Sequence, residues 1–147
     1  MKPINEATTI FLSRSANEGY ARMVAACFMA QLDPTLDELG DVKTAVSEAV
    51  TNAIVHAYPN CLGMVTMRLR LFEDSSMEIM VKDKGVGIED VERARTPLFT
   101  TGGGERSGMG FTIMESFMDT LKVRSSPGKG TSVTMRKKIS RRVGGTR

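Results

Sequence analysis

The sequence has few of the residues that build disulfide frameworks and metal clusters. Its two cysteines, Cys27 and Cys61, exclude a disulfide scaffold and a four-cysteine zinc site. Its single histidine, His56, excludes any mechanism that needs two imidazoles, including an H-E-x-x-H zinc site. We interpret His56 as a structural residue and not as a phosphorylated one.

Long hydrophobic runs are also missing. The longest apolar stretch, residues 23–32, has about ten residues, whereas a membrane-spanning helix needs roughly 20. The N-terminus has no apolar segment followed by a cleavage site. We therefore expect a cytoplasmic protein with reduced thiols and no membrane contact. A length of 147 residues fits one domain.

The positive charge is concentrated at the C-terminus. The formal net charge is +3, but residues 136–147 hold six basic residues and no acidic one, which leaves −3 for residues 1–135. We predict a single domain over residues 1–139 and a basic, disordered tail over residues 140–147. This distribution argues against direct nucleic-acid binding by the domain, although the tail alone could bind an acidic partner or nucleic acid.

The hydrophobic pattern predicts helices that lead the chain and paired strands that follow. Two capping boxes, Ser15–Glu18 and Thr35–Glu38, indicate the first two helix starts. We expect an α+β fold, a two-layer α/β sandwich whose mixed, mostly antiparallel sheet has helices on one face. The predicted helices are 15–32, 35–58, 89–95 and 109–119, and the predicted strands are 7–13, 64–73, 77–83, 120–126 and 131–139.

Several familiar nucleotide-binding and kinase motifs are absent. No G-x-x-x-x-G-K-[ST] sequence occurs, which excludes a P-loop. Two G-x-G pairs, at Gly85–Gly87 and Gly108–Gly110, lack the third glycine of the dinucleotide fingerprint. The sequence also lacks H-R-D and D-F-G, so an ordinary protein kinase is excluded.

Two polar motifs point to chemistry. In SEAVTNAIVHA, Glu48 and Asn52 lie one turn apart on one side of a predicted helix. A carboxylate can act as a general base, and an amide oxygen suits Mg²⁺. In DKGVG, the carboxylate of Asp83 follows a predicted strand and can accept a hydrogen bond from an exocyclic amine. Gly85 and Gly87 allow a ligand to approach the backbone closely.

A third motif is the glycine-rich stretch 96–108, which has no regular period and predicts a mobile loop. It leads into Ser107-Gly108-Met109-Gly110 at a predicted helix start, where backbone N–H groups and the helix dipole bind anions. Arg106 adds a charge that can reach a terminal phosphate. Gly130-Thr131, in the last predicted hairpin, is a weaker fourth motif.

In this order and spacing, the four motifs resemble the N, G1, G2 and G3 boxes of the GHKL (Bergerat-fold) ATPases, which include gyrase, Hsp90, MutL and histidine kinases. Within that superfamily, three longer stretches are similar to the anti-sigma-factor serine kinases of sporulation. These stretches are DPTLDELGDVKTAVSEAVTNAIVHAY, DKGVGIEDVERARTPLFTT and ERSGMGFTIMESFMD. The resemblance covers roughly residues 5–138.

The resemblance implies a role for each motif in binding ATP or ADP with Mg²⁺. It makes Glu48 the general base that takes the proton of a substrate serine. It makes Asn52 the ligand of Mg²⁺, and Asp83 the acceptor for the adenine amino group. The remaining residues implied in nucleotide binding are Gly85, Gly87, Thr100, Thr101, Arg106, Ser107, Gly108, Met109, Gly110 and Thr131.

The resemblance also implies protein partners. The expected protein is a homodimer that binds and inhibits a sporulation sigma factor and phosphorylates a serine of an anti-anti-sigma protein. Arg22, on the first predicted helix, is the implied partner contact. Three alternatives stay open: a stress-response anti-sigma kinase of the same subfamily, an ATP-dependent anti-sigma clamp without catalysis, and the catalytic domain of a histidine kinase.

Overall fold

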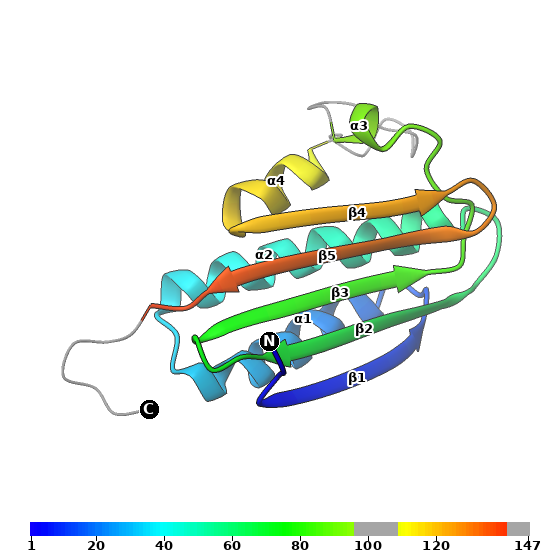
Figure 1. The fold of residues 1–147 in the computed structure, drawn as a ribbon. Helices are drawn as coiled ribbons and strands as arrows, with labels where there is room; N and C mark the ends of the chain where they lie inside the picture. Colours follow the sequence, from blue (N-terminus) through cyan, green and yellow to red (C-terminus); the bar gives the residue numbers. More distant parts are fainter. Residues whose placement is uncertain (96–108, 141–147) are drawn as a thin grey trace.

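The computed structural model describes residues 1–95 and 109–140, and it shows an α+β sandwich (Figure 1). Five strands form one sheet in the order β1-β2-β3-β5-β4. The predicted fold class is confirmed, but the sheet was predicted to be mixed, whereas every pairing among the described strands is antiparallel. The strands are β1 (Asn5–Leu12), β2 (Met64–Leu71), β3 (Ser76–Asp83), β4 (Thr120–Ser126) and β5 (Gly130–Lys138).

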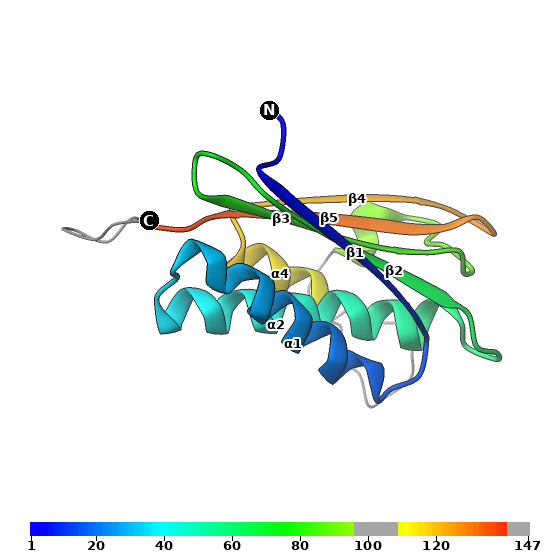
Figure 2. The same cartoon turned by 90° about the horizontal axis from the view of Figure 1, so that it is seen from below.

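Helices cover one face of the sheet and leave the other face open (Figure 2). Among them, α1, α2 and α4 form the second layer, while the short α3 contacts β4. A 3₁₀ turn follows α1, and a π-helical turn follows α2. The bounds are α1 (Asn17–Met29), η1 (Ala30–Leu32), α2 (Leu36–Asn52), η2 (Ala53–Ala57), α3 (Val91–Ala94) and α4 (Gly110–Phe117).

The core lies between the helical layer and the sheet. Strand β2 alternates between buried and half-buried residues, as expected for a strand with one face on the core. On α2, buried residues recur at helical spacing. Burial of each larger apolar side chain contributes about 1.5–3 kcal/mol. These two elements supply Val42, Ala45, Val46, Ala49, Val50, Val65, Met67, Leu69 and Leu71.

The start of α1 differs from the sequence prediction. The N-cap of α1 is Ala16, and no side chain caps the helix, so the predicted Ser15–Glu18 capping box is wrong. The carboxylate of Glu18 turns instead toward α2, where it accepts a hydrogen bond from Ser47 Oγ at 2.8 Å. A tertiary contact has replaced the local one that the sequence pattern indicated.

The second predicted capping box forms and also holds the end of β5. Thr35 Oγ1 accepts from Glu38 N–H at 3.1 Å, and Glu38 Oε1 accepts from Thr35 N–H at 2.8 Å. Glu38 Oε2 accepts from both the backbone N–H and the hydroxyl of Ser140. Partial burial opposes these hydrogen bonds, which together hold the pKa of Glu38 below its ordinary value.

The chain beyond β5 is described only as far as this contact. The sequence prediction placed Ser140 in the tail, whereas its hydrogen bonds tie it to the start of α2. Residues 141–147 lie outside the described residues, so the domain boundary and the tail remain predictions. None of the helices within residues 1–95 and 109–140 is long and apolar enough to cross a membrane.

Candidate functional site

Two polar side chains of α2 lie beside the first residue of α4. Glu48 and Asn52 are one turn apart on α2, and both are half-buried. A Cβ added to Gly110 would lie 3.3 Å from Asn52 Oδ1 and 3.5 Å from Glu48 Oε2. The carboxylate and the amide therefore face one small space at the N-terminus of α4.

The N-terminus of α4 can hold an anion in that space. Its N-cap is Met109 and its first residue is Gly110, and neither side chain carries an oxygen that could accept a helix N–H. The first N–H groups of a helix have no partner within it, and the helix dipole adds partial positive charge. A phosphate bound there would lie next to Glu48 and Asn52.

The tight packing at Gly110 gives a testable prediction. We expect Gly110→Ala to lower the affinity for Mg²⁺-ATP about three- to tenfold, because the added methyl would lie 3.2 Å from Asn52 Nδ2 and displace the amide. Helix stability should not suffer, because alanine favours helices over glycine by about 1 kcal/mol. Calorimetric titration with Mg²⁺-ATP measures the affinity, and thermal unfolding measures the stability.

Gly40→Ala is the matched control for this prediction. Gly40 lies inside α2, and a Cβ there would meet no atom within 4 Å. This variant should keep wild-type ATP affinity and unfold at the same or a higher temperature. Equal ATP affinity for both glycine variants would contradict the placement of Asn52 at the ligand.

Asp83 is a buried carboxylate at the end of β3, where its side chain is held by the backbone of the loop after β3 and of the start of β5. The residue is 6% exposed. Its Oδ1 accepts from Gly85 N–H at 2.9 Å and from Thr131 N–H at 3.2 Å. Both side-chain hydrogen bonds that Asp83 makes with the described residues end on Oδ1, so Oδ2 is the oxygen that can accept from a ligand.

Burial changes the protonation of this carboxylate. Desolvation raises the pKa of Asp83 above its ordinary value, and the hydrogen bonds from Gly85 and Thr131 oppose that rise. The carboxylate is thus costly to ionise in the folded protein without a further hydrogen-bond donor. A ligand amine placed at Oδ2 would supply such a donor.

The loop after β3 packs against the end of the helix that carries Asn52. Val86 N–H donates to Ala57 O at 3.0 Å. A Cβ on Gly85 would lie 2.1 Å from the same carbonyl oxygen, so only glycine fits at this contact. Ala57 follows Asn52 by five residues, or at most about 7.5 Å along a helix axis. This contact therefore brings the Asp83 loop within a mononucleotide's length of Asn52.

The same loop also contacts the β4–β5 hairpin. Gly128 N–H donates to Val86 O at 2.7 Å. Gly87 has a φ of +77°, and a Cβ there would lie 2.1 Å from Ser126 O, so both the conformation and the space require glycine. The loop is held on one side by η2 and on the other by the hairpin.

Tyr58 is a site residue that the sequence pattern did not reveal. Its hydroxyl accepts from Lys84 N–H at 2.7 Å and donates to Met64 O at 2.8 Å. The side chain thereby links the end of η2 to the start of β2 and to the loop after Asp83. Nothing local in the sequence indicates this, because the two partners are 6 and 26 residues away.

We expect Tyr58→Phe to destabilise the protein and to weaken nucleotide binding. Loss of the hydroxyl removes both hydrogen bonds at the base of the loop, with a net cost of about 1 kcal/mol because the groups are partly reached by water. For a domain of this size, the midpoint of thermal unfolding should fall by about 3 °C. Scanning calorimetry with and without ATP measures both effects.

Tyr20→Phe is the control, because its hydroxyl also makes a 2.8 Å hydrogen bond, to Thr9 Oγ1, but on α1 and β1. We expect this variant to bind ATP as the wild type does. If the Tyr58→Phe protein had the same unfolding temperature and the same ATP affinity as the wild type, the hydroxyl would have no role in holding the loop.

Arg22 lies on α1, beside α2, the helix that carries Glu48 and Asn52. Its guanidinium is 3.7 Å from Glu18 Oε2, which also accepts the hydrogen bond from Ser47. Ser47 is the neighbour of Glu48 on α2. Arg22 is therefore connected through two side chains to the helix of the predicted base, and 41% of its side chain is exposed. Its role as a partner contact stays a prediction.

Five predicted nucleotide contacts lie outside the described residues: Thr100, Thr101, Arg106, Ser107 and Gly108. The part of the chain that is described brings together the other predicted residues in two groups. Glu48, Asn52 and Gly110 form the first group, with Met109 next to Gly110 as the N-cap of α4. Asp83, Gly85, Gly87 and Thr131 form the second, joined to the first through the Gly85–Ala57 contact.

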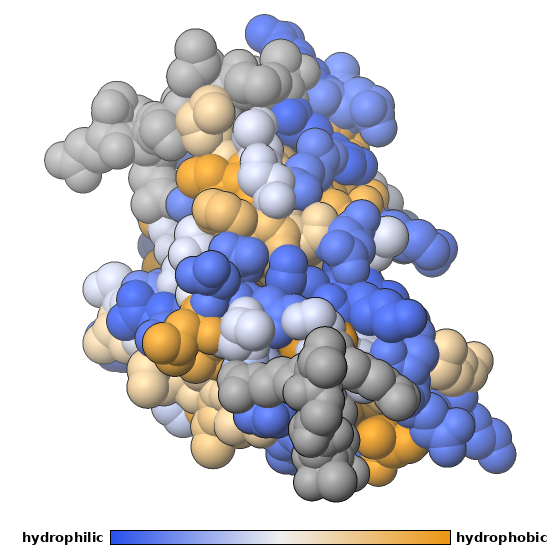
Figure 3. Space-filling model, turned by 90° about the vertical axis from the view of Figure 1, so that its left-hand side faces the viewer, coloured by the Kyte–Doolittle hydropathy of each residue, from blue (hydrophilic) through white to orange (hydrophobic). Residues whose placement is uncertain are grey.

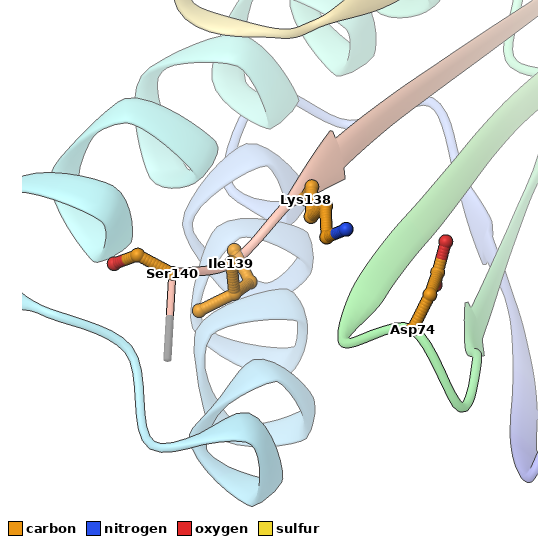
Figure 4. Close-up of a pocket in the computed structure, with 4 residues that line it drawn as sticks. All are labelled: Asp74, Lys138, Ile139 and Ser140. Atoms are coloured by element: carbon orange, nitrogen blue, oxygen red, sulfur yellow. The ribbon is translucent and has the colours of Figure 1, made fainter. Parts of the chain in front are cut away.

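A shallow pocket at the other end of the sheet has no part in this site (Figure 4). It has a volume of about 590 Å³ and lies where Asp74 faces the end of β5, at the side of the molecule crossed by a band of hydrophilic residues (Figure 3). β3 starts near Asp74 and ends at Asp83, roughly 23 Å away. The lining residues are Asp74, Lys138, Ile139 and Ser140.

Comparison with known proteins identifies the family. Residues 11–137 match the family described as the histidine kinase-like ATPase domain. An anti-sigma F factor of Caldanaerobacter subterraneus is 59% identical over 89% of this chain and 92% of its own length. The chain belongs to the anti-sigma F factor family. Another anti-sigma F factor, from Clostridium acetobutylicum, is 53% identical over 92% of this chain and 95% of its own length.

Solved structures support the fold of this anti-sigma F family member. The RsbU and RsbW domains of a Mycobacterium tuberculosis protein match with a TM-score of 0.70 and 17% identity, over 95% of this chain and 34% of that one. A blue-light activated histidine kinase of Erythrobacter litoralis matches with a TM-score of 0.57 and 25% identity, over 73% of this chain and 32% of that one. The family match confirms the predicted superfamily and makes ATP the ligand class of the domain.

Proposed function

We propose that the protein is an anti-sigma factor and an ATP-dependent serine kinase. It binds and inhibits a sporulation sigma factor and phosphorylates a serine of an anti-anti-sigma protein. The observation that carries this proposal is the pairing of Glu48 and Asn52 at the N-terminus of α4, which supports a general base beside a metal ligand and a phosphate site. The 59% identical relative is itself named an anti-sigma F factor.

The residues present suit a magnesium nucleotide. Asn52 Oδ1 is a hard oxygen ligand, and Mg²⁺ usually takes only one or two protein ligands together with substrate phosphates. When bound, Mg²⁺ would neutralise charge on the ATP phosphates. Asp83 would hold the adenine amino group, and Thr131 would support the adenine pocket.

The chain's own groups account for the transfer. Phosphoryl transfer requires mainly positioning and charge stabilisation from the protein. The N–H groups at the start of α4 would hold the phosphates. Glu48 would accept the proton of the serine hydroxyl while the serine oxygen bonds to the γ-phosphorus and the bond from that phosphorus to the β-phosphate oxygen breaks. The products are phosphoserine and ADP.

The protein partners follow from the same proposal. A serine can reach Glu48 only if the substrate protein docks over the nucleotide, and we include in the proposal that the partly exposed Arg22 takes part in this docking. We include a homodimer in the proposal, with β1 and α1 as the interface. We also include a cytoplasmic location and the binding of different partners in the ATP and ADP states.

A transfer assay tests the kinase against the clamp. The purified protein is incubated with Mg²⁺ and γ-labelled ATP, alone and with an anti-anti-sigma protein whose acceptor serine is present or replaced by alanine. We expect label on the serine-containing substrate only. Binding of ATP and of the sigma factor without any labelled substrate would favour a clamp that does not catalyse transfer. Label on this protein's own histidine would favour the histidine-kinase alternative.

A further inference from the structure

A hydroxyl outside the predicted boxes joins the loop after β3 to the start of β5, on the proposed adenine side of the site. Ser125 lies on β4, directly opposite Thr131 of β5 in the sheet. Its Oγ accepts from Ile88 N–H at 2.7 Å, contacts Gly130 O at 3.0 Å and contacts Thr131 Oγ1 at 2.8 Å. One hydroxyl thus makes three hydrogen bonds, to the loop after β3 and to the start of β5.

The direction of each proton in this group follows from elementary chemistry. Gly130 O is a carbonyl and can only accept, so the single proton of Ser125 is directed at it. The backbone N–H of Ile88 can only donate. Ser125 then has one lone pair left, and the hydrogen bond with Thr131 must use the proton of the Thr131 hydroxyl.

The direction of this proton decides what the Thr131 hydroxyl can offer to a ligand. With its proton committed to Ser125, Thr131 Oγ1 has only lone pairs to offer a ligand. Asp83 lies next to it, bound through Thr131 N–H, and its carboxylate also offers only lone pairs when ionised. Both side chains would therefore accept hydrogen bonds from a purine and donate none. Such a pocket suits the amino group of adenine and disfavours the carbonyl group of hypoxanthine or guanine.

We propose that Ser125 is a positioning residue for base specificity, which fixes the Thr131 hydroxyl as an acceptor and so helps the site to reject 6-oxopurine nucleotides. This inference rests on the proposed nucleotide function. Discrimination between the two kinds of purine then depends on Asp83 and Thr131 together. With Asp83 alone, the Thr131 hydroxyl would be free to turn its proton toward a ligand carbonyl. The Ser125 hydroxyl prevents that rotation.

The test compares the affinities for ATP and ITP, which differ at position 6 of the base, an amino group in ATP and a carbonyl in ITP, and in the proton that N1 of hypoxanthine carries. We expect Ser125→Ala to reduce the ratio of the ITP to the ATP dissociation constant at least fivefold, measured by calorimetry with Mg²⁺ present. Ser125→Thr, which keeps a hydroxyl, should retain the wild-type ratio. A purely structural role would weaken both nucleotides equally and leave the ratio unchanged, which would overturn the inference.

Two further variants identify the proton that is responsible. Ser125→Ala combined with Thr131→Val removes the Thr131 hydroxyl, and the ratio should return toward the wild-type value. Ser132→Ala is the matched control, because Ser132 lies one residue along β5 on the opposite face of the sheet, and it should leave the ratio unchanged. If the double variant showed the same reduced ratio as Ser125→Ala, the role assigned to Thr131 would be wrong.

The experiment also separates this inference from the proposed function. If the wild-type protein binds neither nucleotide, the nucleotide function itself is wrong. If it binds ATP and Ser125→Ala leaves the ratio unchanged, only the present inference is wrong. Should Ser125→Ala fail to fold by circular dichroism, Ser125→Cys replaces it, because a thiol is similar in shape but a poor hydrogen-bonding group, and the same fall in the ratio is expected.

Discussion

Glu48→Gln should abolish most phosphoryl transfer and leave ATP binding intact. The amide keeps the size of the carboxylate but cannot accept the serine proton, and loss of a general base typically costs about 10²- to 10⁴-fold in rate. Asn52 and the N-terminus of α4 are unchanged in this variant, so the nucleotide should still bind. Single-turnover transfer to the anti-anti-sigma protein measures the rate, and calorimetry measures the affinity.

Glu73→Gln is the matched control for Glu48→Gln. It makes the same chemical change at an exposed residue of the β2–β3 turn, at the opposite end of β3 from Asp83. This control should transfer phosphate at the wild-type rate. A Glu48→Gln protein with full activity would remove the base assignment, whereas loss of ATP affinity in that variant would indicate that Glu48 acts mainly in binding.

Asp83→Asn should lower ATP affinity roughly 10- to 150-fold, the equivalent of a charge-assisted hydrogen bond worth about 1.5–3 kcal/mol. The reason lies in the two backbone hydrogen bonds on Oδ1. In the variant, the one remaining carbonyl oxygen is required by Gly85 and Thr131, so the Nδ2 amide faces the ligand. Its two protons would then oppose the amino group of adenine. Titration with ATP measures the loss.

The same substitution should stabilise the protein without ligand, in a manner that depends on pH. Because burial raises the pKa of Asp83 above 3.8, the folded protein binds this proton more tightly than the unfolded chain does. The free energy of unfolding therefore falls as pH rises from the unfolded value through the folded one. Asparagine has no such ionisation, so its advantage should grow through that window and then stay constant.

Urea unfolding of wild type and Asp83→Asn at several pH values from about 4 to 8 tests this sign. The two proteins should be closest in stability at the acidic end and differ most at neutral pH. A variant that loses both ATP affinity and stability at neutral pH would show that Asp83 is primarily a structural residue. Gain of stability with loss of binding would show that function opposes stability at this position.

The sequence predicted what local patterns encode. Periodicity and paired strands gave the α+β sandwich, and the Thr35–Glu38 capping box forms because both partners lie within one turn. The Ser15–Glu18 box had the same local pattern but failed, because Ser47, 29 residues away, takes the carboxylate of Glu18. Local patterns therefore hold where no distant group competes for the same atoms.

The parts of the candidate site that the sequence could not predict depend on contacts between distant segments. The hydroxyl of Tyr58 reaches Lys84, and that of Ser125 reaches Ile88, 37 residues earlier in the chain. Serine and tyrosine at strand and helix ends are common, so neither has a distinctive sequence signal. These two side chains were found only once the fold brought their partners together.

The π-helical turn η2, which continues α2, changes the direction in which successive residues point immediately after Asn52. A π turn takes more residues per revolution than an α turn, so the chain beyond it is rotated relative to the preceding face. Asn52 keeps the orientation of α2, whereas Ala57 presents its carbonyl to the glycine loop. Deleting one residue from this turn would restore an uninterrupted α-helix and rotate the Ala57 carbonyl away from that loop. A single-residue change of length would therefore separate the predicted metal ligand, Asn52, from the predicted adenine pocket around Asp83, while every predicted site residue remained in the sequence.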